Sequence, residues 1–245
     1  VTQLVRSSGA KVVLACGTDR GNEVMAHVAA RLDHPFVAHC RSVEPGAGDW
    51  TMTRVQWGGS LLEDISLTAE VVLVTVAHHA VESALADAPA SGVVVDFRPD
   101  LDAALAHTIV ADRVVLTRGV TLSTAPVVVG GGRGVGSAEA FGPLEELAGL
   151  LGGVVGCSRA VTNNGWRPHS DQVGQTGTRI APDIYIASGI SGAIQHWVGA
   201  MAAKNILAIN TDSEANMVAR AGHAVIGDLH LVIPAVIDEI RRRRG

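Results

Sequence analysis

The run PVVVG at residues 126–130 begins the stretch that decides the fold, because four similar runs follow it. These are GGVVGC at 152–157, DIYIAS at 183–188, ILAIN at 206–210 and HAVIGD at 223–228. Helical patterns lie between or after them, in FGPLEELAGLL at 141–151, GAIQHWVGAMA at 192–202 and DLHLVIPAVIDEI at 228–240. Strands that alternate with helices usually pair in parallel, so the five steps predict a parallel sheet.

Polar residues gather directly after these five runs, in GGRGVGS, SRAVTNN, GISGAIQH, NTDSEAN and DLH. In open α/β sheets a ligand binds in the crevice beyond the carboxyl ends of the strands. We therefore expect the functional site at this edge of the sheet.

The first half of the chain has a less regular pattern of strand-like and helix-like runs. A strand at 11–16, a turn at Gly17, a helix at about 20–32 and a strand at 36–40 form a predicted βαβ unit. From residue 43 to about 121, short strand-like runs, TMTRVQWGG, VVLVTVA and GVVVDFR, are separated by turn residues. The predicted fold class is α/β, with a mixed α/β domain at 1–124, which could be incomplete at its N-terminus, and a parallel-sheet domain at 125–245.

Composition excludes several classes of function. A net charge of −5 and 3% aromatic residues argue against nucleic-acid binding, which needs a basic face and stacking rings. No apolar run reaches the length of about 18 residues that a membrane-spanning helix needs. The opening VTQLVRSSGAK has no apolar signal stretch, which favours the cytoplasm. The basic RRRRG end is interpreted as a solvated helix terminus.

The three cysteines, Cys16, Cys40 and Cys157, are scattered and have no CxxC spacing. They indicate neither a disulfide framework nor a metal site, and we interpret them as small buried hydrophobic residues.

Two glycine-containing segments are candidates for phosphate binding. GGGRGVGS at 130–137 matches neither GxGxxG nor a P-loop, so a tight strand-to-helix turn is the commoner explanation, and Arg133 could pair with a phosphate or with a surface carboxylate. In GISGAIQH, Ser191 and Gly192 are predicted to start a helix whose free N–H groups face the crevice. His196 follows about one turn later, and a lone helix histidine is more often a satisfied or exposed side chain.

The segment SDQVGQTGT at 170–178 is a long polar loop between two strands, a kind of loop that tends to be functional or mobile. Gln172, Gln175 and Thr176 offer hydrogen-bonding groups suited to a heteroaromatic edge, whereas Gly174 and Gly177 could simply make turns. Asn210 and Asp228 follow the fourth and fifth runs, and Asp228 is equally a good helix N-cap. No Cys-His, Ser-His-Asp or paired-carboxylate arrangement is evident, so the crevice looks like a cofactor holder.

These motifs resemble a known family. GGRG, CSRA, DQVGQTG, ISGAIQH, AIN and GDL, in this order over 127–231, are similar to the FAD domain of electron-transfer flavoprotein α subunits, also called the FixB family. The first half of the chain is only weakly similar, and we expect the first βα elements of the family to be missing from it. The chain also departs from the family at Thr211, where Lys is usual, in NNGWRPHS at 163–170, and in SEANMVA at 213–219.

The resemblance implies FAD as cofactor and a role for each matching residue. Arg133 would approach the pyrophosphate, and Ser158 and Arg159 the isoalloxazine ring. The loop before DIYIAS would line the flavin, with the Thr176 hydroxyl near the hydride-accepting nitrogen; its residues are Gln172, Val173, Gly174, Gln175 and Thr176. The start of the next helix would hold the phosphates and the pyrimidine end of the ring, through Ser191, Gly192, Ala193, Ile194, Gln195 and His196. The adenosine would be held by Asn210, Asp228 and Leu229. Arg159, His196 and this helix start would place positive potential at the pyrimidine end.

The resemblance also implies the function. The chain would be the α subunit of a heterodimer with a β subunit, a redox carrier that turns over no substrate and relays single electrons from dehydrogenases to a quinone oxidoreductase. Acyl-CoA dehydrogenases of fatty acid β-oxidation are the typical donors. The location would be the bacterial cytoplasm, with the mitochondrial matrix as its eukaryotic equivalent. An electron-bifurcating NADH-linked subunit and a non-redox adenine-nucleotide-binding module remain alternatives.

Overall fold

The computed structural model describes residues 1–82, 84–85, 87, 92–102 and 119–244. Contacts between residues divide the chain into two compact units, 1–117 (unit 1) and 118–245 (unit 2). The boundary between 124 and 125 expected from sequence remains a prediction. In the described ranges, no helix combines the length and hydrophobicity that crossing a bilayer requires.

Unit 1 contains a mixed five-stranded sheet of order β1-β5-β2-β3-β4. Strands β1, β5 and β2 are parallel, and β2, β3 and β4 are antiparallel. The predicted βαβ unit is present, with β5 paired between its two strands. The elements are α1 (Thr2–Ser8), β1 (Val12–Cys16), α2 (Asp19–Leu32), β2 (Phe36–Pro45), β3 (Trp50–Gln56), η1 (Trp57–Gly59), β4 (Leu61–Leu67) and β5 (Val72–Val76).

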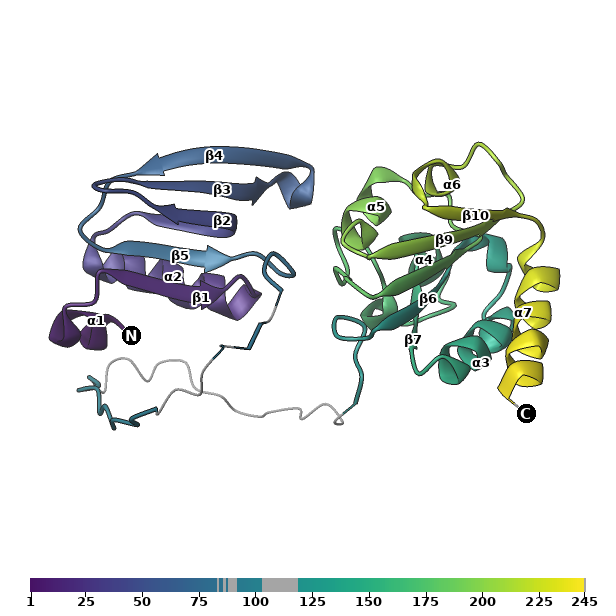
Figure 1. Cartoon of the computed structure of the whole chain (residues 1–245), viewed down its shortest axis with the longest axis horizontal. Coiled ribbons are helices and arrows are strands. Elements are labelled where there is room, and N and C mark those ends of the chain that lie inside the picture. The colour runs from purple at the N-terminus through teal and green to yellow at the C-terminus, as the bar shows by residue number, and fades with distance from the viewer. Residues whose placement is uncertain (83, 86, 88–91, 103–118, 245) are drawn as a thin grey trace. The chain divides into compact units, whose positions relative to one another are not determined.

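Helix α2 covers part of this sheet because one of its faces is apolar. Met25, Val28 and Ala29 are its buried residues, and they pack with Val5 of α1 and Leu73 of β5. Figure 1 shows α1 and α2 beside the parallel strands β1 and β5. The helix begins after Thr18, whose hydroxyl accepts a hydrogen bond from Gly21 N at 3.0 Å.

Two expectations for unit 1 are wrong. The described run GVVVDFR forms no strand: Val93, Val94 and Val95 are 86%, 93% and 80% exposed, and no strand of the described residues pairs with them. Strand-forming residues need a partner strand, which composition alone does not provide. Cys16 is exposed because it ends the edge strand β1, whereas Cys40 and Cys157 are buried as expected.

Unit 2 contains the predicted all-parallel sheet, of order β10-β9-β8-β6-β7. Its elements are β6 (Val127–Gly131), η3 (Arg133–Val135), η4 (Glu139–Phe141), α3 (Gly142–Leu150), β7 (Val154–Cys157), α4 (Arg159–Asn163), η5 (His169–Asp171), β8 (Ile184–Ser188), α5 (Ile194–Ala200), β9 (Asn205–Asn210), α6 (Asn216–Arg220), β10 (His223–Ile226) and α7 (Leu229–Arg244).

The sheet of unit 2 is covered on both faces, as buried parallel strands require. One apolar cluster includes Leu144 of α3 and Ile233 of α7, and the other includes Ala200 of α5 and Met217 of α6. Figure 1 shows α3 and α7 together on one side of the sheet and α5 and α6 on the other. The arginines that end α7 are exposed and partly ion-paired, as the interpretation of a solvated helix end predicts.

Candidate functional site

The neighbouring strands β6 and β8 of unit 2 create a crevice. From β6 the chain crosses over to β7 on one side, and the connection that leads on to β8 places that strand on the other side of β6. Neighbouring parallel strands whose connections diverge in this way leave a gap beyond their carboxyl ends, the usual ligand position in open α/β sheets.

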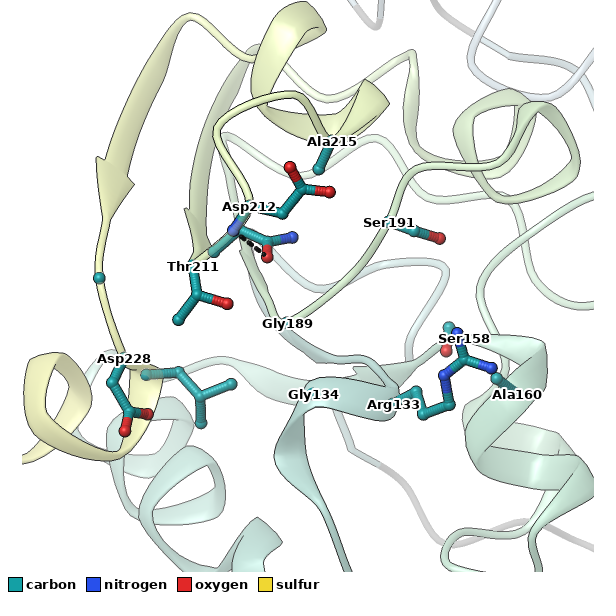
Figure 2. Close-up of a pocket in the computed structure, with 13 residues that line it drawn as sticks. Arg133, Gly134, Ser158, Ala160, Gly189, Ser191, Thr211, Asp212, Ala215 and Asp228 are labelled. Atoms are coloured by element: carbon teal, nitrogen blue, oxygen red, sulfur yellow. Dashed lines mark hydrogen bonds between the residues drawn. The ribbon is translucent and has the colours of Figure 1, made fainter.

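A cleft of about 390 Å³ lies at this position. It is lined by residues that follow all five strands: Arg133, Gly134, Ser158, Ala160, Gly189, Ser191, Asn210, Thr211, Asp212, Ala215, Gly227, Asp228 and Leu229. In Figure 2, Arg133 and Ser158 lie on one side of the cleft and Asp228 and Thr211 on the other. The cleft therefore offers a cationic group at one side and acidic and hydroxyl groups at the other.

The glycines at the end of β6 and directly after it are needed for packing. A Cβ atom on Gly130 would lie 2.4 Å from the Tyr185 hydroxyl oxygen, and one on Gly131 would lie 2.4 Å from the Phe141 ring. Gly132 and Gly134 donate backbone hydrogen bonds to the C-terminal end of β8 and the residue that follows it, at 2.8 and 3.1 Å. The tight-turn interpretation accounts for these glycines, while Arg133 and Gly134 line the cleft.

Helix α5 begins at Ile194, later than the predicted start at Ser191 and Gly192. Gly192 has a left-handed φ of +78°, and its Cβ position would lie 2.3 Å from Met217 N, so the backbone cannot turn into a helix there. Ser191 lines the cleft instead.

Three helices begin at this edge without a side-chain cap. The N-cap residues of α4, α5 and α6 are Ser158, Ala193 and Ala215, and none of them accepts a capping hydrogen bond from the described residues. Two of the three, Ser158 and Ala215, line the cleft. At α6 the Met217 N–H already donates to Ser191 O at 3.1 Å, so the start of α4 is the one that leaves N–H groups at the cleft for a bound acceptor.

The acidic side of the cleft is shaped by local hydrogen bonds. Asn210 Oδ1 accepts from Asp212 N at 3.1 Å, and the Asn210 amide donates to Ile190 O at 3.1 Å. Asp228 Oδ1 accepts from His230 N at 2.9 Å and thereby caps α7, as the N-cap interpretation predicts. The other carboxylate oxygen is not used by this cap.

The remaining predicted residues form a second group beside the cleft rather than in it. Gln175 N donates to Gln195 O at 2.7 Å, which joins the loop 172–176 to the start of α5. Gly174 and Gly199 pack closely enough to exclude a Cβ atom on Gly199. The exposed members of the group are Arg159, Gln175, Thr176, Ala193, Ile194 and Gln195, and the buried members are Gln172, Val173, Gly174, Gly192 and His196.

His196 is a buried, neutral residue. Its Nε2 atom lies 2.8 Å from the Tyr185 hydroxyl, and its Nδ1 atom faces the Val173 backbone without a well-formed hydrogen bond among the described residues. Burial lowers the pKa of the imidazole from 6.5 to about 4. The expected positive charge on His196 is therefore wrong at neutral pH, because the low-dielectric surroundings disfavour the cation.

Sequence reasoning assigned no binding role to several cleft residues: Gly134, Ala160, Gly189, Thr211, Asp212, Ala215 and Gly227. Asp212 and Thr211 belong to NTDSEAN, one of the polar segments expected at this edge, so the signal for them was present. The described residues hold no group of three or more His, Cys, Asp or Glu side chains that could bind a metal.

The fold and the cleft together define an α/β protein with a crevice suited to an anionic nucleotide. Comparison with known families makes this specific. Residues 121–201 match the electron transfer flavoprotein FAD-binding domain, and residues 1–102 match the electron transfer flavoprotein domain.

Curated relatives agree over nearly the whole chain. The electron transfer flavoprotein subunit alpha of Mycobacterium leprae (strain TN) is 38% identical over 242 residues, which are 99% of this chain and 75% of the relative. The subunit alpha of Bacillus subtilis (strain 168) is 35% identical, over 92% of this chain and 69% of the relative. Protein FixB of Bradyrhizobium diazoefficiens is 35% identical, over 99% and 67%.

The chain belongs to the family of electron transfer flavoprotein α subunits. The resemblance drawn from the motifs is confirmed, and so is FAD as the cofactor of the matched domain. The subunit designation of the relatives implies a β subunit as partner.

Proposed function

We propose that this chain and a β subunit form a heterodimer that transfers single electrons from dehydrogenases, typically acyl-CoA dehydrogenases, to a membrane quinone oxidoreductase. FAD, when bound, supplies the redox chemistry. The observation that carries the proposal is the cleft at the switch point between β6 and β8, in a chain of the electron transfer flavoprotein family. Its location in the cytoplasm remains a prediction.

The residues present fit this cofactor. Arg133 and the N–H groups near Ser158 suit a pyrophosphate, which is anionic and accepts hydrogen bonds. Asn210 and Asp228 suit the ribose and adenine, which offer hydroxyl and amino donors. Ser188 Oγ is buried at the end of β8 and has no hydrogen-bond partner among the described residues, so the polar edge is not fully satisfied by the protein.

We assign the second group, around the loop 172–176 and the start of α5, to the flavin ring. Thr176 is exposed and would donate from its hydroxyl to a ring nitrogen. Arg159, at the first turn of α4, is exposed beside the cleft residue Ser158 and would supply the cation near the ring. His196 would contribute as a neutral imidazole rather than as a cation. These groups would bind and orient the ring and set its redox potential.

The test separates ring contacts from adenosine contacts in the purified heterodimer. Thr176→Val removes one hydroxyl and should shift the flavin potential more than it changes FAD affinity, because the lost hydrogen bond stabilises the oxidised and the reduced ring unequally. Asp228→Ala should do the reverse, with weaker FAD binding and little change in potential. FAD dissociation and spectroelectrochemical potential are measured for both variants, with Asp228→Asn as the variant that keeps the helix cap.

Two results would contradict the proposal. A colourless heterodimer that carries only an adenine nucleotide would establish the non-redox alternative. Rapid oxidation of NADH by the heterodimer would establish the bifurcating alternative. If the heterodimer is yellow but its flavin potential is unchanged in Thr176→Val, the electron-transfer function stands and the assignment of Thr176 to the flavin ring is wrong.

A further inference from the structure

The buried amide of Gln172 lies between two threonine hydroxyls. Gln172 is 2% exposed. Its Oε1 accepts a hydrogen bond from Thr162 Oγ1 at 2.8 Å, and its Nε2 donates to Thr176 Oγ1 at 2.9 Å. The three side chains form a continuous chain of hydrogen bonds from α4 to the loop 172–176.

The backbone holds this amide in place. Val173 N donates to Cys157 O at 2.9 Å, and Gln172 forms a parallel bridge with Cys157, so the residue is attached to the end of β7. The side chain therefore starts from a fixed point on the sheet. Its reach to Thr176 is set by the fold and not by a mobile surface rotamer.

This chain of hydrogen bonds leaves the hydroxyl hydrogen of Thr176 free to donate. A threonine hydroxyl has one hydrogen to donate and two lone pairs that accept. Because Thr176 Oγ1 accepts from Gln172, its own hydrogen is not used in this chain. Thr176 is exposed while Gln172 is buried, so that hydrogen is left for an acceptor outside the protein core.

The orientation of the amide decides this outcome. If the oxygen faced Thr176, that hydroxyl would donate inward to Gln172 and could no longer donate outward. Thr162 sets the orientation by donating its single hydrogen to Oε1 at 2.8 Å, and Arg159 O, 3.0 Å from the same hydroxyl, is the competing acceptor for that hydrogen.

We propose that Gln172 is a positioning residue that acts through Thr176: its amide, oriented by Thr162, keeps the Thr176 hydroxyl a donor toward the bound flavin. This inference rests on the proposed function, since it needs the flavin ring at Thr176. In this role Gln172 does not touch the flavin ring. It lies behind Thr176, and Thr176 is the residue that contacts the ring.

The experiment is a double-mutant cycle on the heterodimer with FAD bound. Gln172→Met replaces the amide by a neutral side chain of similar length, and Thr176→Val removes the hydroxyl. The midpoint potential and the FAD dissociation constant are measured for both variants and for their combination. Asn163→Ala, an exposed residue next to Thr162 on α4, is the control and should leave the potential unchanged.

We expect Gln172→Met to shift the potential in the same direction as Thr176→Val, and to lose that shift when Val already occupies position 176. Thr162→Val should produce a smaller shift that is lost in the same background. It provides the test if Gln172→Met fails to assemble, because it removes only a hydroxyl.

Additive shifts would overturn the inference, since Gln172 would then act without Thr176, and so would an unchanged potential in both Gln172→Met and Thr162→Val. Failure of the wild-type heterodimer to bind FAD would instead contradict the proposed function. The two failures are therefore distinguished by the wild-type spectrum alone.

Discussion

Both units place a turn and a helix after a parallel strand, but they use the polar groups of that turn differently. In unit 1 the turn after β1 is closed: Thr18 caps α2, and Cβ atoms on Gly17 and Gly21 would lie 2.5 Å from Val76 O and 1.9 Å from Cys16 O. In unit 2 the starts of α4, α5 and α6 have no side-chain cap from the described residues.

The difference explains why the candidate site lies in unit 2. The Thr18 hydroxyl pairs one of the otherwise free N–H groups at the start of α2, so this helix start has fewer donors to offer a ligand. The uncapped start of α4, whose N-cap Ser158 lines the cleft, keeps its donors for a bound anion. The same supersecondary unit thus builds a scaffold in one part of the chain and a binding edge in the other.

The largest effect is expected from the turn before α5. Gly192→Ala adds a Cβ 2.3 Å from Met217 N at a φ of +78°, so it should cost about 3 to 5 kcal/mol of unfolding free energy. Gly9→Ala in unit 1 is the matched control, because its φ is +68° but nothing lies within 4 Å. It should cost about 1 to 2 kcal/mol. Thermal unfolding of both variants checks this, and equal losses would contradict the packed turn.

The next effect is a pH dependence that belongs to unit 2. His196 has its pKa lowered to about 4 by burial, whereas an unfolded histidine titrates near 6.5. As the pH falls, the unfolded chain therefore binds the proton first. The stability contributed by the neutral ring is complete above pH 6.5 and is lost toward pH 4, by about 3 kcal/mol in total.

This prediction is checked by denaturant unfolding at several pH values between 7 and 4. His196→Gln should flatten the dependence in that window, and His223→Gln, at an exposed position on β10, should leave it unchanged. If His196→Gln shows the same pH profile as the wild type, groups other than His196 cause the pH dependence.

The sequence was sufficient to predict the parallel sheet of unit 2, because five repeated strand and helix patterns agree with each other. Isolated patterns were less reliable. The run GVVVDFR has the composition of a strand but no pairing strand among the described residues, and β4, whose sequence LLEDISL carries two adjacent acids, was not recognised.

The candidate site was predictable at the level of its edge but not of its contacts. The need for glycine at 130 comes from Tyr185, 55 positions later in the chain, a contact that no local pattern contains. The polar stretch before the loop 172–176 has a similar explanation. Arg167 pairs with Glu145 and with Asp171, and its guanidinium lies 5.4 Å from the centre of the Phe141 ring, so ionic and cation–π contacts order a segment that lacks an apolar pattern.

The smallest effect expected compares the two capped helices, α2 and α7. Thr18→Ala and Asp228→Ala each remove a side-chain acceptor from a helix start, so each should cost about 1 kcal/mol of unfolding free energy. Only Asp228 also lines the cleft, so only Asp228→Ala should weaken FAD binding, by about tenfold for a lost contact of about 1.4 kcal/mol.

Asp228→Asn separates the two roles of this residue. Asparagine caps a helix as well as aspartate does, so the variant should keep its stability while it loses the carboxylate in the cleft. Isothermal titration with FAD and thermal unfolding are measured on all three variants in the heterodimer. Weaker FAD binding in Thr18→Ala, or full affinity in both Asp228 variants, would show that the two capped helix starts do not differ in their contact with FAD.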